Sequence, residues 1–383
     1  MASKPSILLF SEDFPPNYGG IGQWAIGVAQ SIHRMGYPLH LLTRYMNPEA
    51  EMLQNREPYP VIQVHGKRWS QFRSFYTYSA IKNIYKKGIK PDIVIATTWN
   101  IARGITRILK KNKTKLVIVV HGLEVTRTMP WLKTRWLQQT LNAADAVIAV
   151  SNFTRDRVIE RCNINPSKVH FLPNGVDPQR FFPRSNTTHL QEKYNLHNKK
   201  VILTLARLQE RKGHDKVIEA LPTVLKEIPN AHYLISGALK GTYYKTLQQQ
   251  VSNLRLNEHV TFTGFVDSAD LNAFYNVCDV YIMPSRELEK KGDTEGFGIT
   301  FLEANACEKA VIGGRSGGVA DAIDDGKTGY LVNPLDSNEI AEKLIYLLSN
   351  PELATQFGKQ GRQRILTSYT WDAVTKKLLA TIA

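Results

Sequence analysis

Two carboxylates, Glu295 and Glu303, lie eight positions apart around a glycine-rich turn that leads into an apolar helix. Residues 295–299 read Glu-Gly-Phe-Gly-Ile, so the expected helix begins with unpaired backbone N–H groups at the positive end of its dipole. Such a helix terminus suits a phosphate, whereas carboxylates suit sugar hydroxyls. The segment therefore indicates a ligand that is part sugar and part diphosphate; the alternative is a helix start with ordinary surface glutamates.

Two cations lie in a second segment of the same half of the chain. Arg207 and Lys212 follow the apolar run 201–206 and precede a helical pattern over 215–225. An arginine fork and a lysine point charge, five residues apart, can hold a diphosphate between them. The alternative is a solvated basic loop. It is the weaker interpretation, because the glycine-rich turn at Glu295 is expected at the end of another strand in the same half of the chain.

Two segments of the first half also follow candidate strands. His121 comes directly after the run 116–120, where a histidine can hydrogen-bond a substrate at its reacting centre. A loop histidine with a purely structural partner is the alternative. Gly19 and Gly20 follow the run 6–10 at some distance, and glycines there allow the backbone to approach a ligand closely.

Composition indicates an ordinary soluble protein with an unequal distribution of charge. The 383 residues are 43% hydrophobic and 22% charged, and the net charge is +15. Residues 1–180 contribute +14 of this excess and residues 181–383 only +1. The first half is therefore expected to meet an anionic partner, either a lipid surface or a nucleic acid, unless the charge serves solubility alone.

Aromatic residues accompany the basic ones in two stretches of the first half, 65–84 and 127–137. Basic residues beside Trp and Tyr suit the headgroup region of an anionic bilayer; aromatic residues of the core with solvated charges between them are the alternative. The residues predicted to face an acceptor or a membrane are Lys67, Arg68, Trp69, Arg73, Arg127, Trp131, Lys133 and Arg135.

The apolar segments predict the fold. Two series of short β-type runs alternate with helical patterns, which is typical of parallel sheets covered on both faces. The strands expected in the first series are 6–10, 39–43, 93–97, 116–120 and 146–151. Those expected in the second series are 201–206, 231–236, 260–263, 279–283, 310–313 and 329–332. We therefore expect two doubly wound α/β domains that face each other across a cleft, with ligands at the carboxyl ends of the strands.

The order and spacing of these motifs resemble those of the retaining GT-B glycosyltransferases of family four over essentially the whole chain. The motifs that carry the resemblance are Phe14-Pro-Pro with Gly19-Gly20, His121-Gly, Val150-Ser-Asn, Pro173-Asn-Gly-Val-Asp, Arg207 with Lys212-Gly, Glu295-Gly-Phe-Gly with Glu303, and Gly317-Gly318. Within that family the charged insert between Pro284-Ser-Arg and Asp293-Thr-Glu is similar to the pattern of bacterial phosphatidylinositol mannosyltransferases.

The resemblance implies a Rossmann-like N-terminal domain over 1–180, on the acceptor or membrane side. It also implies a Rossmann-like nucleotide-sugar domain over 181–368 and a C-terminal helix, about 369–383, that returns to the first domain. The linker is expected within 177–198, which is rich in Pro, Arg, Asn and Thr.

The resemblance also implies roles for single residues. Arg207 and Lys212 would neutralise the diphosphate, Glu295 would bind the donor sugar, Glu303 the ribose, and His121 the reacting centre. The implied catalytic set is His121, Arg207, Lys212 and Glu295. The implied donor-binding set is Gly19, Gly20, Arg207, Lys212, Gly264, Phe265, Val266, Glu295, Gly296, Phe297, Gly298, Ile299 and Glu303.

The implied activity is transfer of a hexose with retention of configuration, without a metal or another cofactor. Mannose from GDP-mannose is the first expectation, and glucose or another hexose from a UDP-sugar is the next. A lipid or lipid-linked glycan is the expected acceptor, and no Asp-x-Asp motif stands where a metal site would need it.

The sequence also predicts the compartment in which the protein works. No apolar run is long enough to cross a membrane, and three scattered cysteines predict a reducing compartment. We expect a cytoplasmic protein, with peripheral attachment to the inner face of the membrane as a further option. The alternatives are a sugar-nucleotide epimerase of the same fold and a basic nucleic-acid-binding protein, although no nucleic-acid partner is expected.

Overall fold

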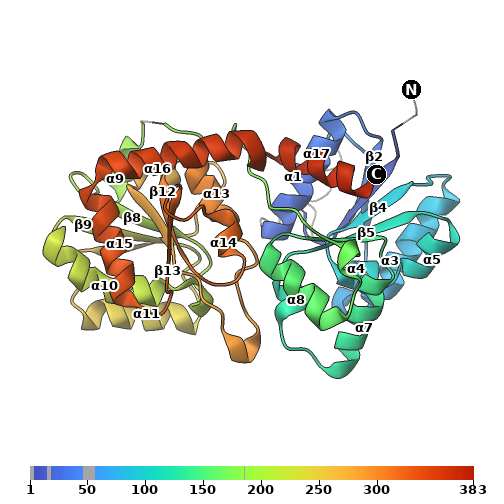
Figure 1. Ribbon diagram of the computed structural model, residues 1–383, viewed down its shortest axis with the longest axis horizontal. Helices are drawn as coiled ribbons and strands as arrows, with labels where there is room; N and C mark the ends of the chain where they lie inside the picture. The colour runs from blue at the N-terminus through green and yellow to red at the C-terminus, as the bar shows by residue number, and fades with distance from the viewer. Residues whose placement is uncertain (1–3, 15–18, 46–56, 185) are drawn as a thin grey trace. The chain divides into compact units, whose positions relative to one another are not determined.

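The computed structural model describes residues 4–14, 19–45, 57–184 and 186–383. The chain forms two compact units, and each has its own sheet and helices (Figure 1). Unit 1 comprises Met1–Gly175 and Trp371–Ala383, and unit 2 comprises Val176–Thr370. The division precedes the expected linker, because Val176 already pairs with Thr370 in a parallel bridge within unit 2.

Unit 1 contains a parallel sheet of seven described strands in the order β3-β2-β1-β4-β5-β6-β7. These strands are β1 (Ile7–Ser11), β2 (Leu39–Arg44), β3 (Val61–Val64), β4 (Ile93–Ala96), β5 (Lys115–Val120), β6 (Ala146–Ala149) and β7 (Val169–Phe171). The central strands are buried along their whole length, as expected for a sheet covered on both faces. The two strands that the sequence pattern missed, β3 and β7, are the short edge strands.

Helices connect the strands of unit 1. They are α1 (Gly20–Arg34), α3 (Trp69–Lys86), α4 (Trp99–Ala102), α5 (Thr106–Lys111), α6 (Leu123–Thr126), α7 (Trp131–Asn142), α8 (Asn152–Cys162) and the C-terminal α17 (Trp371–Ile382). The long connections between parallel strands require such crossovers.

The C-terminal helix α17 belongs to unit 1, although it is reached through the whole of unit 2. The Trp371 ring fills the space beside Gly27 and Gly175, where a Cβ atom would lie 2.3 Å and 2.7 Å from ring atoms. Asp372 accepts hydrogen bonds from Ser31 and Arg34, both at 2.6 Å. The predicted return of this helix to the first domain is therefore seen.

Unit 2 contains a parallel sheet of six described strands in the order β10-β9-β8-β11-β12-β13. They are β8 (Lys200–Leu205), β9 (Ala231–Ser236), β10 (Val260–Gly264), β11 (Val280–Met283), β12 (Ala310–Gly314) and β13 (Gly329–Val332). Each of the six lies within one or two residues of its predicted range. The two-sheet α/β architecture predicted from the sequence is thus confirmed.

Helices form layers beside this second sheet. In Figure 1 the helices α10, α11 and α15 lie on the side of the sheet opposite α13 and α16. The longer helical elements are α9 (Thr188–Lys193), α10 (His214–Glu227), α11 (Thr242–Asn253), α12 (Leu271–Val277), α13 (Ile299–Ala306), α14 (Val319–Ala322), α15 (Ser337–Ser349) and α16 (Pro351–Arg364). Short turns of other helix type are η3 (Glu210–Lys212), η4 (Glu289–Lys291) and η5 (Ile365–Tyr369).

The strand order reverses once in each sheet, between β1 and β4 in unit 1 and between β8 and β11 in unit 2. At such a point the loops leave neighbouring strands in opposite directions, which opens a crevice at the carboxyl ends of the strands. The segments that follow β8 and β11 are those that carry Arg207, Lys212 and Glu295.

Candidate functional site

The ionic side chains predicted in unit 2 lie at the reversal point of its sheet. Glu295 Oε2 is 2.5 Å from Lys212 Nζ and 2.6 Å from Arg211 Nη1. Arg211 Nε also lies 3.3 Å from Asp293 Oδ1. Arg211 and Lys212 are almost completely buried. The two loops therefore meet in a compact cluster of two cations and two carboxylates.

This cluster keeps Glu295 ionised. Burial by itself would raise the pKa of Glu295, but the attraction of Lys212 and Arg211 and their hydrogen bonds lower it to about 2. Burial lowers the pKa of Lys212, and Glu295 opposes that effect. Lys212 is therefore held in direct contact with an ionised carboxylate.

The turn after Glu295 delivers the start of α13 to the same place. Gly298 is the residue before the helix and has a φ of +90°, which suits glycine. A Cβ atom there would also lie 2.6 Å from the Phe301 ring. Within the described residues, no side chain accepts a hydrogen bond at this cap. The N–H groups of the first turn are thus oriented by the backbone and are suited to an anion.

Glu303 lies one turn further along α13 and is 2% exposed. The Tyr275 hydroxyl donates a hydrogen bond of 2.5 Å to its Oε2 atom. The hydrogen bond from Tyr275 therefore fixes a buried carboxylate. Its assignment to the ribose stays a prediction.

Other predicted donor residues are more exposed. Arg207 lies in the loop directly after β8 and is exposed, unlike Lys212 five residues later. Gly264 ends β10 with a φ of +84°, and the Phe265 side chain that follows is 73% exposed. Val266 is half-buried. Phe265 therefore presents an exposed apolar ring at the edge of the sheet, and such a ring is suited to contact with a nucleotide base.

In unit 1, His121 follows β5 and packs edge-on against Trp24 of α1, with ring centroids 5.8 Å apart. Burial lowers its pKa to about 4, although a hydrogen bond with the Thr97 backbone opposes this. The ring is therefore neutral near pH 7. Among the described residues, Nε2 is buried and has no hydrogen-bond partner.

Glu124 holds the turn that carries His121. Its carboxylate accepts a hydrogen bond from the His121 backbone N–H, and the Gly122 N–H also contributes. Burial raises the pKa of Glu124, and these backbone hydrogen bonds oppose the effect. Arg161 donates from Nη1 to three consecutive backbone carbonyls at the end of the same turn, at 2.8–3.0 Å. The sequence pattern predicts His121 but does not predict Glu124 or Arg161 as its supports.

The glycines after β1 are placed differently from those before α13. Gly19 precedes α1 and Gly20 is its first residue, and both are exposed. Within the described residues, an added Cβ atom at either position would meet nothing within 4 Å. Residues 15–18, part of the same predicted motif, lie outside the described residues.

The basic aromatic stretches divide between surface and core. Lys67, Arg68, Arg127, Lys133 and Arg135 are exposed, as is Trp131. Exposed apolar side chains beside them in sequence are Phe72, Phe75, Tyr78 and Leu132. The prediction is wrong for Trp69, which is 2% exposed and belongs to the core of unit 1.

Arg73 is also less available than predicted. Its Nη2 atom forms a 3.0 Å ion pair with Glu12, and both side chains are largely buried. Its charge is compensated within unit 1, so the surface charge comes from its neighbours.

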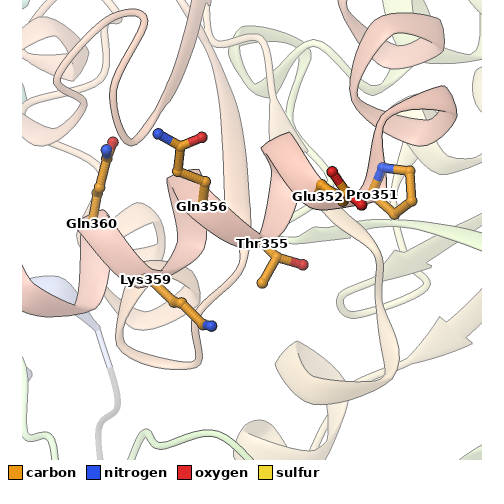
Figure 2. A pocket seen from close by; sticks show the side chains of 6 residues that line it. All are labelled: Pro351, Glu352, Thr355, Gln356, Lys359 and Gln360. Atoms are coloured by element: carbon orange, nitrogen blue, oxygen red, sulfur yellow. The ribbon is translucent and has the colours of Figure 1, made fainter.

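A surface hollow that contains none of the predicted site residues lies over α16 (Figure 2). Its lining residues all come from that helix: Pro351, Glu352, Thr355, Gln356, Lys359 and Gln360. In Figure 2 the side chains of Thr355 and Lys359 point away from those of Gln356 and Gln360. They do not converge, and the predicted site residues are elsewhere.

Within the described residues, no group of three or more His, Cys, Asp or Glu side chains is placed to hold a metal ion. No helix formed by these residues has the length and apolarity that crossing a membrane would need.

Two family models match the chain. The model described as Glycosyltransferase Family 4 matches residues 18–180, and the model described as Glycosyl transferases group 1 matches residues 186–364. Together they leave only residues 1–17, 181–185 and 365–383 unmatched.

Curated relatives match over most of the chain. A GDP-mannose-dependent alpha-(1-6)-phosphatidylinositol monomannoside mannosyltransferase of Mycolicibacterium smegmatis is 37% identical over 258 residues, 67% of each chain. The protein of the same name from Mycobacterium tuberculosis strain CDC 1551 is 29% identical over 396 residues, covering 97% of this chain and 96% of its own.

Solved structures agree on the fold. A glycosyltransferase from Rickettsia africae superposes with a TM-score of 0.84 at 23% identity, covering 99% of this chain and 98% of its own. The Anabaena protein HepE, solved in complex with UDP and glucose, has a TM-score of 0.81 at 19% identity and covers 98% and 99%.

Proposed function

We propose that this chain, which belongs to the family-four glycosyltransferases of the GT-B fold, moves a mannose from GDP-mannose to a hydroxyl of a lipid-type acceptor. That it is a hexosyltransferase follows from the family itself. The donor, the acceptor and the stereochemistry are our proposal. A UDP-hexose is the second candidate donor. Because the matched families are transferases, the epimerase and nucleic-acid alternatives have less support.

The observation that carries the proposal is the buried ionic cluster at the strand reversal of unit 2. Lys212 and Glu295 lie in contact there, next to the N-terminus of α13. A nucleotide sugar needs both a cation for its diphosphate and hydrogen-bond acceptors for its hydroxyls. This cluster provides both within the loops after β8 and β11.

The proposed reaction balances without a metal. The bond between the sugar C1 and the diphosphate oxygen breaks, and the acceptor hydroxyl forms the new C1–O bond on the same face. The hydroxyl proton passes to the leaving phosphate oxygen, so no protein nucleophile takes part. Lys212, Arg207 and the helix terminus stabilise the negative charge that develops on the diphosphate.

His121 has a different part in this proposal. A neutral imidazole cannot stabilise the diphosphate by charge, but its Nε2 atom can form one hydrogen bond to the sugar. The lowered pKa of His121, about 4, supports the neutral form throughout the physiological range. We assign His121 to orientation of the sugar at the reacting carbon.

The proposed donor and acceptor take their support from the relatives. The two mannosyltransferases named above use GDP-mannose and act on phosphatidylinositol monomannoside, as their names state. The HepE structure contains UDP and glucose, which keeps a UDP-hexose as the second donor to test. We propose a phosphatidylinositol mannoside, or a related glycolipid, as the acceptor.

A lipid acceptor requires contact with a membrane, and unit 1 offers a surface suited to it. Trp131 is 72% exposed and Phe75 is 66% exposed, and basic side chains lie near them in sequence. Aromatic rings at headgroup depth with Lys and Arg around them favour anionic bilayers. We propose peripheral attachment to the cytoplasmic face, where nucleotide sugars are found.

The experiment that tests this function is release of nucleotide from GDP-, UDP- and ADP-sugars, in EDTA, with and without anionic vesicles that contain phosphatidylinositol mannoside. We expect release of GDP from GDP-mannose that needs the acceptor and is not reduced by EDTA. Release that needs no acceptor and leaves the sugar rearranged would favour an epimerase. Abolition by EDTA would contradict the metal-free reaction.

A further inference from the structure

We propose that Arg211 is a positioning residue for the donor sugar: it holds Glu295 and Asp293 together and so fixes the loop between β11 and α13. The inference rests on the proposed function, because Glu295 meets a sugar only if the donor binds in unit 2. The sequence pattern predicts Arg207 and Lys212 as cations for the diphosphate and gives no role to Arg211, which lies between them.

The geometry of Arg211 is that of a buried fork. Nη1 lies 2.6 Å from Glu295 Oε2, and Nε lies 3.3 Å from Asp293 Oδ1. The residue is 3% exposed. A planar guanidinium can engage two carboxylates in fixed directions, which a lysine ammonium cannot do. Arg211 therefore joins the two carboxylates, through a hydrogen bond to Glu295 and an ion pair with Asp293.

A second arginine connects the same two segments in the opposite direction, from the loop after β11 to the start of α10. Arg286, at the start of the same loop, donates two hydrogen bonds of 2.9 Å to the carboxylate of Asp215 at the start of α10. Its backbone N–H donates to the Arg211 carbonyl at 2.8 Å. Each end of the loop is thus joined to the segment around η3 by one buried arginine.

The loop between these two ends is a self-contained turn. The Leu288 N–H donates to the Asp293 carbonyl at 2.9 Å, and Gly292 has a φ of +57°. The 3-10 turn η4 lies inside this closure. Because the turn closes on itself, the position of Asp293 on Arg211 determines how the whole insert presents Glu295.

The two cations on Glu295 can then have different tasks. In the described residues, the side-chain hydrogen bonds to Glu295 from Arg211 and Lys212 both end on Oε2. Oε1 is left as an acceptor for a sugar hydroxyl. Because its ammonium is a point charge without a fixed direction, Lys212 can interact with a diphosphate as well as with Glu295. Arg211 remains on Glu295 and Asp293 and keeps the carboxylate ionised and in place.

The test compares two ligands that differ only in the sugar. Calorimetry measures the Kd of GDP and of GDP-mannose for the wild type and for Arg211→Lys, Arg211→Ala and Asp293→Asn, with UDP and UDP-glucose as the second pair. Arg184→Ala, an exposed arginine of the same unit, is the matched control. Turnover and thermal unfolding are measured on the same samples.

We expect Arg211→Lys to bind GDP within about twofold of the wild type but GDP-mannose about tenfold more weakly, since a charged hydrogen bond to the sugar-binding carboxylate is misdirected. kcat should fall further than the affinity for GDP-mannose. Asp293→Asn should show the same selectivity in weaker form. This variant keeps the proposal testable if Arg211→Ala does not fold.

Equal weakening of GDP and GDP-mannose in Arg211→Lys would mean that the residue only maintains the fold, and would overturn the proposal. Unchanged affinity for both ligands with unchanged kcat would overturn it as well. A wild type that binds none of the four ligands would instead contradict the proposed function, and this inference with it.

Discussion

Two basic dipeptides of the same chemistry have opposite environments in this molecule. Lys67-Arg68 in unit 1 is exposed ahead of α3, whereas Arg211-Lys212 in unit 2 is buried in η3. The difference lies in the partners: Asp293 and Glu295 reach the second pair from another loop. A buried cation persists only with a counter-charge. The exposed pair is therefore suited to a surface and the buried pair to a defined ligand.

The largest effect is expected from removal of the buried lysine. Lys212→Ala should lower the rate of transfer about a thousandfold, since one preorganised charge that stabilises a leaving diphosphate is lost. Transfer of radiolabelled mannose from GDP-mannose measures this. Lys226→Ala, an exposed lysine in the last turn of α10, is the control. Near-normal turnover by Lys212→Ala would contradict the assignment of the buried dipeptide to the donor diphosphate.

The counter-ion should matter for stability as well. Glu295→Gln leaves two buried cations without their shared carboxylate, and should lower the free energy of unfolding by about 3 kcal/mol at pH 7. Because the pKa of Glu295 is lowered from 4.5 to about 2 in the folded protein, its stabilisation is complete above pH 4.5 and is lost as the pH falls towards 2.

Urea unfolding of the wild type and Glu295→Gln across pH 7 to pH 2.5 checks this. The difference between the two free energies should narrow below pH 4.5. Glu227→Gln, at an exposed position, should show no such narrowing. A difference that is constant with pH would mean that ionisation of Glu295 does not contribute to the fold.

A smaller effect is expected at the exposed surface of unit 1. Lys133→Ala should weaken binding to anionic vesicles about fivefold, which corresponds to about 1 kcal/mol for one basic residue near a charged bilayer. Trp131→Ala should weaken it by loss of an interfacial ring. Vesicle co-sedimentation at two salt concentrations measures both, with Lys226→Ala as the control from unit 2. Equally weakened vesicle binding by Lys226→Ala would show that the protein is attracted to anionic vesicles by its overall charge and not by the surface around Lys133.

The smallest effect on vesicle binding is expected from the buried tryptophan. Trp69→Phe should leave binding within about twofold of the wild type, while a loss of packing lowers stability by about 1 kcal/mol. Co-sedimentation and thermal unfolding separate the two quantities. A loss of vesicle binding as large as that of Trp131→Ala would show that Trp69 reaches the membrane after all.

Sequence periodicity predicted the fold well because most strands of both sheets are buried runs of apolar residues. The runs around Leu9 and Ile235, for example, are unbroken by charge. The edge strands β3 and β7 were missed for two reasons: β7 has only three residues, and in β3 the polar Gln63 interrupts the apolar run and only the two end residues are buried. The glycine turn before α13 was also predictable, since Gly298 requires a backbone conformation that few other residues adopt.

The site residues that sequence reasoning missed depend on tertiary partners. Nothing local distinguishes Arg211 from a solvated arginine, because Asp293 and Glu295 come from another loop more than eighty residues away. Trp69 was misjudged for a related reason. The helix α3 has Phe72 in a non-helical conformation, so a regular helical period does not assign its inward face.

The most direct test of the central claim is calorimetric titration of GDP and of guanosine into the wild type and Lys212→Ala, in EDTA. If the buried pair in unit 2 is the diphosphate site, the wild type should bind GDP far more tightly than guanosine, and Lys212→Ala should lose most of that difference. Equal binding of GDP by the wild type and Lys212→Ala would contradict the account.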